Sequence, residues 1–321
     1  MKYFSNTYFL LSILILLSIA NLLSGSINIF KTSDVQTLLL ELRLPKVLTG
    51  IATGSIIAIC GLILQILFRN PLAGPYVLGI SSASSLFTSI GIMGTGLITY
   101  PLIYHLQLNL LSISGALVGL MIILLMLQIT SQIIIILLVG FMLSQLYSAI
   151  QSILTYLSTE HALKLFTLWT MGNIQNTNLI QSLILFGISI ISLIIILRYS
   201  KPLSIYITGD ESAKVMGIDI EKIKKNLIII TAVLIGIITA YCGPIAFVGM
   251  SIPILVRILN KNANIYQWIQ HTFLYGSISI ILTDLINQWI FNGSMPLNVL
   301  ISIWGVPLLI WILIKQMKFL I

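Results

Sequence analysis

The strongest indication of fold lies in the segment Leu42–Ser85, LRLPKVLTGIATGSIIAICGLILQILFRNPLAGPYVLGISSASS. It opens with two cations around a proline and then runs from Val47 to Phe68 without a charged residue. A helix rises about 1.5 Å per residue and the hydrocarbon core of a bilayer is roughly 30 Å thick, so this run is long enough to span a membrane. Proline lacks an amide proton and disfavours helix in the preceding residue, so the Arg-Asn-Pro sequence that follows should end the helix.

Part of this helix is repeated later in the chain. The sequence GSIIAICG at residues 54–61 returns as GIITAYCG at residues 236–243, an offset of 182 residues (236 − 54). The same offset pairs Cys60 with Cys242, the two cysteines of the chain, and also aligns two prolines. Matching glycines alone are common in apolar sequence, but the cysteine and proline matches indicate an internal duplication.

Small residues gather on one face of the repeated helix. Such residues allow the backbone of a second helix to approach, although an ordinary membrane helix would show the same pattern. We expect close helix packing at Gly50, Gly54, Gly61, Gly236 and Gly243.

The composition is that of a membrane protein. Of the 321 residues, 58% are hydrophobic and 7% are charged, and the mean hydropathy is +1.09. Soluble domains carry about 25% charged residues. The net charge of +8 comes from cations scattered at loop ends, which indicates topology signals rather than a surface for nucleic acid.

Several kinds of chemistry are not expected. Three widely separated histidines, and two cysteines within apolar runs, predict no metal site, no disulfide framework and no cofactor. The sequence lacks the nucleotide-binding motif G-x-x-x-x-G-K-[ST], and no nucleophile is paired with a base. We therefore expect a protein that is not an enzyme.

Apolar runs predict an all-α polytopic membrane protein with about ten transmembrane helices. They lie near residues 7–27, 47–68, 76–98, 107–130, 132–158, 177–199, 225–243, 245–260, 267–291 and 297–314. The first run resembles a secretory signal, but it is long and further spans follow, so we expect an uncleaved first helix.

The distribution of cations predicts the orientation. With both termini inside, twelve of the sixteen Lys and Arg residues fall in cytoplasmic segments, as the positive-inside rule requires. Five spans then separate the starts of helices 2 and 7, so the repeated helices run in opposite directions. We expect one transmembrane domain over residues 1–321 with an inverted-topology repeat, helices 2–5 (47–158) and helices 7–10 (about 225–314).

Few polar groups are expected within or beside the spans. Asp284 is the one acid within a predicted span; we favour a structural role between helices because it has no companion for a proton or sodium relay, and the alternative is a proton or sodium site. The serines that begin the third helix either bond back to the backbone or line a pathway. Arg43 and Lys46 fall on the outer face, where they either contact lipid headgroups or form a basic docking surface.

The one long polar segment is the predicted cytoplasmic loop at residues 199–226. Asp210 and Glu211 suit the first turn of a short helix, and Gly217 suits its C-terminal end. We expect two short helices there. They are either a linker or, as the charge of the loop favours, a docking surface for a soluble partner.

Several blocks follow one another along the chain: R-L-P-K (43–46), F-R-N-P-L-A-G-P-Y-V-L-G-I-S-S (68–82), L-V-G-F-M-L-S (138–144), L-W-T-M-G-N-I (168–174), E-S-A-K-V-M-G-I (211–218), A-Y-C-G-P-I-A-F-V-G (240–249), P-I-L-V-R (253–257) and M-P-L-N-V-L-I-S-I-W-G-V-P (295–307). This ordered set resembles the FecCD-type permeases, the membrane subunits of ABC importers for iron-siderophores, haem and cobalamin. The chain departs from the usual family residues at Ile254, Gln288, Met295 and Asn298.

The resemblance implies a permease dimer, here a homodimer, around one central pathway, with two ABC ATPase subunits below and an extracytoplasmic substrate-binding protein above. The ATPase-coupling residues it implies are Asp210, Glu211, Ala213, Met216, Gly217 and Ile218. The docking residues for the binding protein are Arg43 and Lys46. The pathway candidates are Ser81, Ser82, Ser84, Ser85, Met142 and Ser144.

The implied function is that of a non-catalytic permease subunit in the bacterial cytoplasmic (inner) membrane, in contact with membrane lipid. As substrate we rank an iron(III)-siderophore first, haem second and cobalamin third. The alternative is an ion-coupled secondary transporter that uses Asp284, which would need no ATPase subunit. A non-transporting scaffold would leave the inverted repeat without a purpose.

Overall fold

The computed structural model describes residues 7–25, 34–71, 73–94, 101–130, 132–209, 216 and 219–317. All regular structure within these ranges is helical, which confirms the predicted all-α class. Six helices are long and apolar enough to cross a membrane, and four shorter apolar helices accompany them in the same ranges. The exact number of ten spans remains a prediction.

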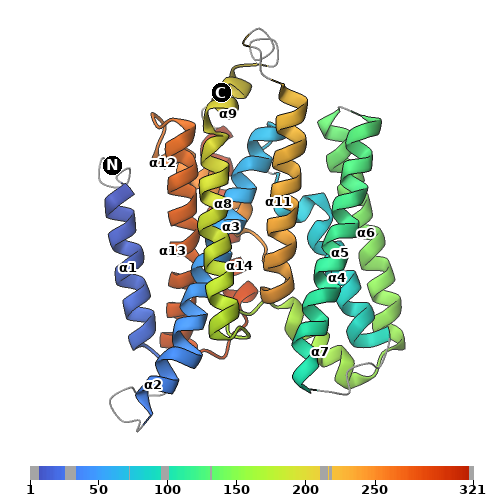
Figure 1. Ribbon diagram of the computed structural model, residues 1–321, viewed down its shortest axis with the longest axis vertical. Helices are drawn as coiled ribbons and strands as arrows, with labels where there is room; N and C mark the ends of the chain where they lie inside the picture. Colours follow the sequence, from blue (N-terminus) through green and yellow to red (C-terminus); the bar gives the residue numbers. More distant parts are fainter. Residues whose placement is uncertain are drawn as a thin grey trace. The chain divides into compact units, whose positions relative to one another are not determined.

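Each predicted apolar run contains a helix, with ends shifted by several residues (Figure 1). In chain order the α-helices are α1 (Thr7–Leu23), α2 (Val35–Thr37), α3 (Leu44–Leu67), α4 (Ile80–Ser89), α5 (Pro101–Ile129), α6 (Ile133–Leu157), α7 (Glu160–Thr170), α8 (Leu179–Arg198), α9 (Ser200–Thr208), α11 (Ile220–Cys242), α12 (Val248–Leu259), α13 (Ile265–Phe291) and α14 (Leu297–Met317). The π-helical turns η3 (Leu38–Arg43) and η5 (Ile90–Gly94) and the 3-10 turn η4 (Pro75–Leu78) join them.

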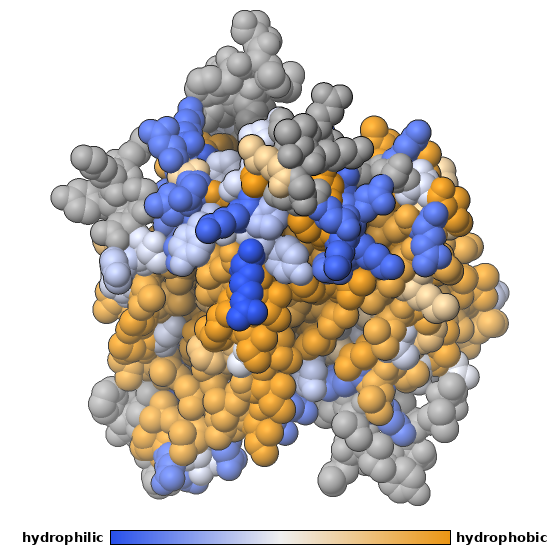
Figure 2. Space-filling view, turned by 45° about the horizontal axis from the view of Figure 1, so that its top comes forward, coloured by the Kyte–Doolittle hydropathy of each residue, from blue (hydrophilic) through white to orange (hydrophobic). Residues whose placement is uncertain are grey.

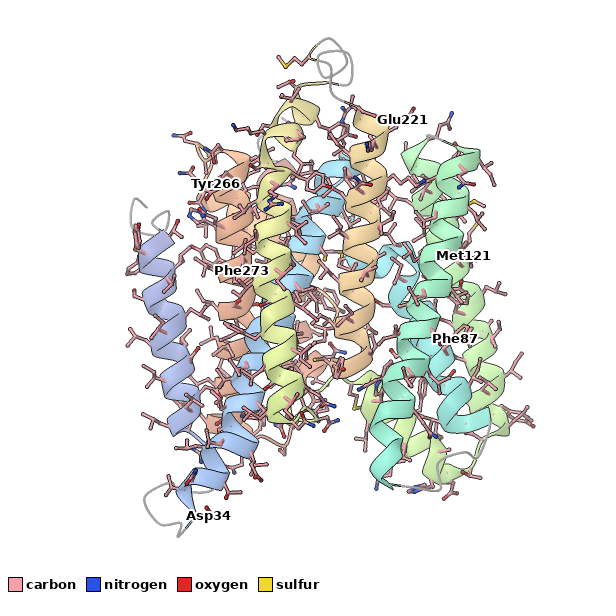
Figure 3. The ribbon with its side chains drawn as sticks, in the orientation of Figure 1. Asp34, Phe87, Met121, Glu221, Tyr266 and Phe273 are labelled. Carbon is pink, nitrogen blue, oxygen red and sulfur yellow. The ribbon has the colours of Figure 1, made fainter. Side chains whose placement is uncertain are left out.

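The helix that contains α3 begins earlier than the predicted Val47. Asp34 caps its start, since the carboxylate accepts a hydrogen bond of 3.3 Å from the backbone N–H of Thr37. Asp34 lies at the tip of this helix in Figure 3. From there α2, η3 and α3 form one continuous helix from Val35 to Leu67. Side-chain oxygens at an N-cap satisfy amide protons that have no partner within the helix, so the helix starts at the cap.

The chain divides into two compact units, each built from segments that are far apart in sequence. The first comprises Met1–Leu62, Ile174–Ile220 and Ala246–Ile321, and the second comprises Ile63–Asn173 and Glu221–Ile245. Both copies of the predicted repeat contribute to each unit, so the compact units do not coincide with the copies. The division of the domain into two sequence repeats remains a prediction.

In the first unit α1 and α13 lie side by side and run in the same direction (Figure 1). The hydroxyl of Thr7, at the start of α1, is 3.2 Å from Nε2 of His271, and Asn21 near the end of α1 contacts Asp284. Apolar side chains of α1, α3, α8 and α13 pack together in one cluster around the buried Ile281. These four helices therefore share one core.

Helix α3 runs along α13 in the opposite direction, and glycines set the distance between them. A methyl group on Gly54 would overlap the carbonyl oxygen of Gly276, and one on Gly61 would overlap the carbonyl oxygen of Gly249 in α12. Backbones approach this closely only where no side chain intervenes. The hydroxyl of Ser277 also donates a hydrogen bond of 3.2 Å to the carbonyl oxygen of Ile51 across the same crossing.

In the second unit α4 packs against both α5 and α6. Ala83 and Leu86 of α4 form a buried cluster with Tyr147 of α6. Helix α11 joins this unit at Gly236, because a side chain there would collide with Ala116 of α5.

The two repeated segments thus pack in reciprocal ways. The first copy, in α3, packs on α13 from the second half of the chain, whereas the second copy, in α11, packs on α5 from the first half. In the predicted repeat, α5 and α13 hold equivalent places as helices 4 and 9. This is the arrangement that results when two duplicated halves exchange one helix each.

We expect Gly54→Leu to lower the thermal unfolding temperature of the protein in detergent, because leucine can fit beside Gly276 only if α3 and α13 separate. Overpacking of a well-packed core costs about 1–3 kcal/mol. The matched control is Gly187→Leu in α8, where an added Cβ would meet no atom within 4 Å. Equal unfolding temperatures for the two variants would contradict the close crossing.

Candidate functional site

A buried ion pair joins α3 to α13. Nζ of Lys46 lies 2.9 Å from Oδ2 of Asp284, and the two side chains are 11% and 3% exposed. Charges attract one another far more strongly in a low-dielectric interior than in water, but each also loses its hydration. Such a pair persists only where further hydrogen bonds complete it.

Two amide side chains complete this pair. Nδ2 of Asn21, on α1, donates a hydrogen bond of 2.8 Å to Oδ2 of Asp284, and Nε2 of Gln288 donates one of 2.6 Å to the same oxygen. Nε2 of Gln288 also lies 3.0 Å from Oδ1 of Asn21, which accepts from it. Asp284 and Gln288 are four residues apart and so share one face of α13. One carboxylate oxygen therefore gathers donors from three helices, and we call these four residues the buried charge cluster: Asn21, Lys46, Asp284 and Gln288.

Arg43 lies beside the charge cluster and contacts the end of α1. Its side chain is 6% exposed, and Nη1 donates a hydrogen bond of 2.7 Å to the carbonyl oxygen of Leu22. A cation at the C-terminal end of a helix is favourable because the helix dipole is negative there. The π-helical turn η3 ends at Arg43, so the wider turn helps to set the direction in which the Arg43 side chain projects from the helix.

These positions correct one expectation about charge and extend another. We expected Arg43 and Lys46 to lie on the outer face and meet lipid headgroups or a binding protein, but Arg43 is buried and Lys46 is half-buried in an ion pair within the chain. A docking role for the two cations remains a prediction. For Asp284 we favoured a structural role between helices, because the sequence offers no companion for a proton or sodium relay; the structure adds a partner that we did not name, Lys46. The signal was present in the sequence, since a lone acid and a lone cation in apolar helices satisfy one another best by pairing.

The serines at the start of α4 are buried within the second unit. The hydroxyl of Ser84 donates a hydrogen bond of 2.8 Å to the carbonyl oxygen of Ser112 in α5. The hydroxyl of Ser81 is 3.5 Å from that of Thr239 in α11. Ser82 and Ser85 are buried as well. Within this chain, then, the four serines lie at helix contacts and do not face an open space.

The two pathway candidates of α6 have different environments. Ser144 is buried, and its hydroxyl donates a hydrogen bond of 3.0 Å back to the carbonyl oxygen of Gly140. Met142 is 65% exposed. Among the six candidates, Met142 is thus the side chain that this chain leaves open to another molecule.

Helix α6 also carries polar residues that the sequence analysis did not select. Gln145, Ser148 and Ser152 are exposed and share one face of the helix, at spacings of three and four residues. We call these three residues the polar stripe. A count of polar residues by helical face would have found it, because the opposite face of α6 packs on α4 through Tyr147.

The exposed face of α8 provides a contrast. Its serines at 182, 189 and 192 are buried, and before Arg198 at its end the large side chains that it exposes are aliphatic: Ile180, Leu183, Ile184, Ile190, Ile191, Ile194 and Ile195. This is the pattern expected where a helix faces lipid, which offers no hydrogen-bond partner. On the face drawn in Figure 2, hydrophobic residues cover the middle and hydrophilic residues gather toward the ends. The polar stripe of α6 departs from this pattern.

The predicted ATPase-coupling residues fall largely outside the described part of the chain. Asp210, Glu211, Ala213, Gly217 and Ile218 lie there. Met216 is described and is 64% exposed. The first of the two short helices expected in this loop, from Asp210 to Gly217, lies outside the described residues apart from Met216; the structure shows α9 before it, at Ser200–Thr208, and the long helix α11 directly after Asp219. Among the described residues no group of three or more His, Cys, Asp or Glu side chains could hold a metal ion.

The sequence profile of the FecCD transport family matches residues 7–315 of this chain. The chain belongs to the FecCD transport family. Its relatives include the hemin transport system permease HmuU of Yersinia pestis, 29% identical over 96% of this chain and 95% of that protein. The vitamin B12 import system permease BtuC of Vibrio parahaemolyticus is 30% identical over 95% of this chain and 92% of that protein.

Two further comparisons extend this picture of the family. The molybdate import system permease MolB of Haemophilus influenzae is 27% identical over 85% of this chain and 80% of that protein. A solved structure described as a metal-chelate type ABC transporter in an inward-facing conformation matches with a TM-score of 0.85 and 27% identity. The match covers 96% of this chain and 98% of that chain, so the FecCD fold extends over almost all of the sequence.

We expect Asp284→Asn and Lys46→Met each to destabilise the protein, because each change leaves a buried charge without its partner. Breaking a buried pair in this way typically costs about 3–5 kcal/mol. The double variant should be more stable than either single variant, since it leaves no lone charge. Thermal unfolding in detergent measures all three, with Lys164→Met, at an exposed cation of α7, as the control. Additive losses in the double variant would argue against a direct pair.

Proposed function

We propose that this FecCD-family permease forms the membrane-spanning part of an ABC importer and passes a metal chelate through the cytoplasmic membrane of a bacterium. The match to a metal-chelate type ABC transporter over nearly the whole chain carries the proposal. Its relatives are named as permeases for hemin, vitamin B12 and molybdate. Within this range we place an iron chelate first, as an iron(III)-siderophore or as haem, with cobalamin after them.

The pathway in this proposal runs along the polar stripe of α6. Gln145, Ser148 and Ser152 would be poorly placed against lipid, and the chain's own helices leave them exposed. A second copy of the chain, related by a two-fold axis, would place the same stripe on the opposite side of a shared channel. Met142 precedes the stripe on the same face and would offer the channel a flexible apolar surface.

The energy in this proposal comes from other chains. The sequence contains no G-x-x-x-x-G-K-[ST] motif, so ATP hydrolysis would be carried out by two separate ATPase subunits. They would bind the cytoplasmic face at residues 210–218, the segment that resembles the family's coupling region. A substrate-binding protein would deliver the chelate at the opposite face. In this proposal both termini lie in the cytoplasm, which the excess of Lys and Arg residues in the predicted cytoplasmic segments supports.

The alternative, an ion-coupled secondary transporter, depends on a titratable group that can gain and lose its ion. Asp284 is poorly suited to that role, because Lys46 already neutralises it and two amides donate to the same carboxylate oxygen. Those contacts fit a structural group better than a transport site.

We expect uptake in proteoliposomes to require ATP together with the ATPase subunits and the binding protein encoded with this permease. The measurement is accumulation of a radiolabelled iron chelate, with haem and cobalamin compared in parallel. An imposed pH gradient without ATP should give no uptake. Uptake that follows the pH gradient and stops in the Asp284→Asn variant would contradict the ABC importer and favour the secondary transporter.

We expect Gln145→Leu to reduce uptake at least severalfold without lowering thermal stability, because it removes a polar contact for the passing chelate and leaves helix packing intact. The matched control is Ile191→Leu on the exposed face of α8, which should transport at the wild-type rate. Wild-type uptake by Gln145→Leu together with Ser148→Ala would show that the stripe does not line the pathway.

A further inference from the structure

Arg257 in the last turn of α12 has two hydrogen-bond donors with no acceptor among the residues that the structure describes. These donors, its Nε and Nη2 atoms, are buried. The residue as a whole is part-buried, at the point where α12 gives way to the turn before α13. A buried donor that has lost water and gained no acceptor is costly, and more so when it carries a charge.

The guanidinium is held by the tryptophan that follows the turn. Its central carbon lies 5.6 Å from the centroid of the Trp268 ring, a cation–π contact. Nε1 of Trp268 in turn donates a hydrogen bond of 3.1 Å to the carbonyl oxygen of Asn260. Nε and Nη2 form one edge of the guanidinium, and this edge can give two parallel hydrogen bonds to a carboxylate.

No acidic residue of the neighbouring segments can fill this edge. Helix α12, the turn at residues 260–264 and α13 up to Leu282 contain no Asp or Glu. The ion pair found among the described residues is that of Lys46 and Asp284, near the other end of α13. The turn adds a further cation, the exposed Lys261. The described segments next to Arg257 therefore offer this edge no carboxylate, which leaves it available to an anionic group from another molecule.

The position of Arg257 within the first unit indicates what that molecule is. Helix α9 packs on α13, and it lies at the same end of α13 as the α12–α13 turn (Figure 1). Tyr266, labelled in Figure 3, marks this end of α13. Helix α9 leads directly into the segment at which we propose that the ATPase subunit binds. The other exposed side chains of the turn are uncharged and polar, Asn262 and Asn264, as expected for a surface that meets water or a soluble protein.

We propose that Arg257 receives a carboxylate side chain of the ATPase subunit, which it binds edge-on through Nε and Nη2 while Trp268 supports the face of the guanidinium. The proposal rests on the proposed function, because it needs an ATPase partner. It adds a second contact between the two subunits, separate from residues 210–218. Since both atoms are shielded from solvent in the isolated chain, the guanidinium must rotate on the face of Trp268 to present this edge when the carboxylate arrives.

The test compares substitutions at Arg257 with matched substitutions at Arg198, an exposed arginine at the end of α8. The dissociation constant of the purified ATPase subunit is measured against permease in nanodiscs. Loss of one partner of a buried, hydrogen-bonded charge pair should weaken binding by roughly 30-fold or more in Arg257→Gln. Arg257→Lys keeps the charge but loses the paired donors, so its affinity should lie between those of wild type and Arg257→Gln. Arg198→Gln should stay within about twofold of wild type, as expected for an exposed charge.

A charge exchange identifies the partner residue. Arg257→Glu should abolish binding, and one Asp→Arg or Glu→Arg substitution in the ATPase subunit should restore it. Wild-type affinity in a folded Arg257→Gln permease would overturn the proposal. If Arg257→Gln does not fold, Arg257→Lys and the charge exchange decide. The proposal is then overturned if Arg257→Lys binds the ATPase subunit with wild-type affinity and no Asp→Arg or Glu→Arg substitution in that subunit restores binding to Arg257→Glu.

Two controls are needed. The first distinguishes a carboxylate of the ATPase subunit from a lipid phosphate as the group that Arg257 binds. The second distinguishes a permease that lacks only the Arg257 contact from one that binds no ATPase subunit at all. Thermal stability of the permease alone is measured in nanodiscs of phosphatidylcholine with and without phosphatidylglycerol. If Arg257→Gln removes a stabilisation by phosphatidylglycerol but leaves ATPase affinity unchanged, the edge binds lipid phosphate and the proposal is wrong. If the wild-type permease binds no ATPase subunit, the proposed function itself fails, and this outcome is distinct from loss of binding in the Arg257 variants alone.

Discussion

The ion pair between Lys46 and Asp284 is the interaction on which the first unit depends most. Neither charge could be buried alone in an apolar bundle, because no ion pair or hydrogen bond would offset the loss of its hydration. Together, and with the amides of Asn21 and Gln288, they form a polar contact that is closed to the surroundings. The pair also fixes register, since it sets which turn of α3 faces which turn of α13. Buried polar contacts are known to select one packing arrangement in this way, as in coiled coils.

Register and distance come from different residues along the same two helices. The ion pair sets the register at one end, and the glycine contact of Gly54 with Gly276 sets the separation further along. Apolar side chains such as Ile281 fill the remaining space, but lipid is as apolar as they are, so they give little preference for one arrangement over another. A membrane protein of this kind therefore owes its specific fold to a small number of polar and small residues.

The sequence was sufficient for the helices and insufficient for the contacts between them. Runs of apolar residues located the ten apolar helices that the structure describes, because the length of a membrane span is set by the bilayer, but they gave no sign of the short helices α7 and α9. The start of the α3 helix was missed because Asp34 caps it well before the apolar run begins. The partner of Asp284 was missed because Lys46 lies in a distant part of the chain, and pairing depends on how two helices meet. The serines of α4 remained undecided for the same reason, since whether a hydroxyl faces a neighbour or a channel is a property of packing.

The two helices of the predicted repeat differ in one respect at their crossings. In the first unit Gly54 meets another glycine, whereas in the second unit its counterpart Gly236 meets the methyl group of Ala116. The first crossing thus brings backbone against backbone, and the second inserts a side chain. The two crossings of the predicted repeat thus differ by one methyl group. At the glycine–glycine crossing, substitution is restricted on both helices, because a side chain on either glycine would collide with the backbone of the other helix. The glycine–alanine crossing already accommodates one methyl group, so there only the glycine must lack a side chain.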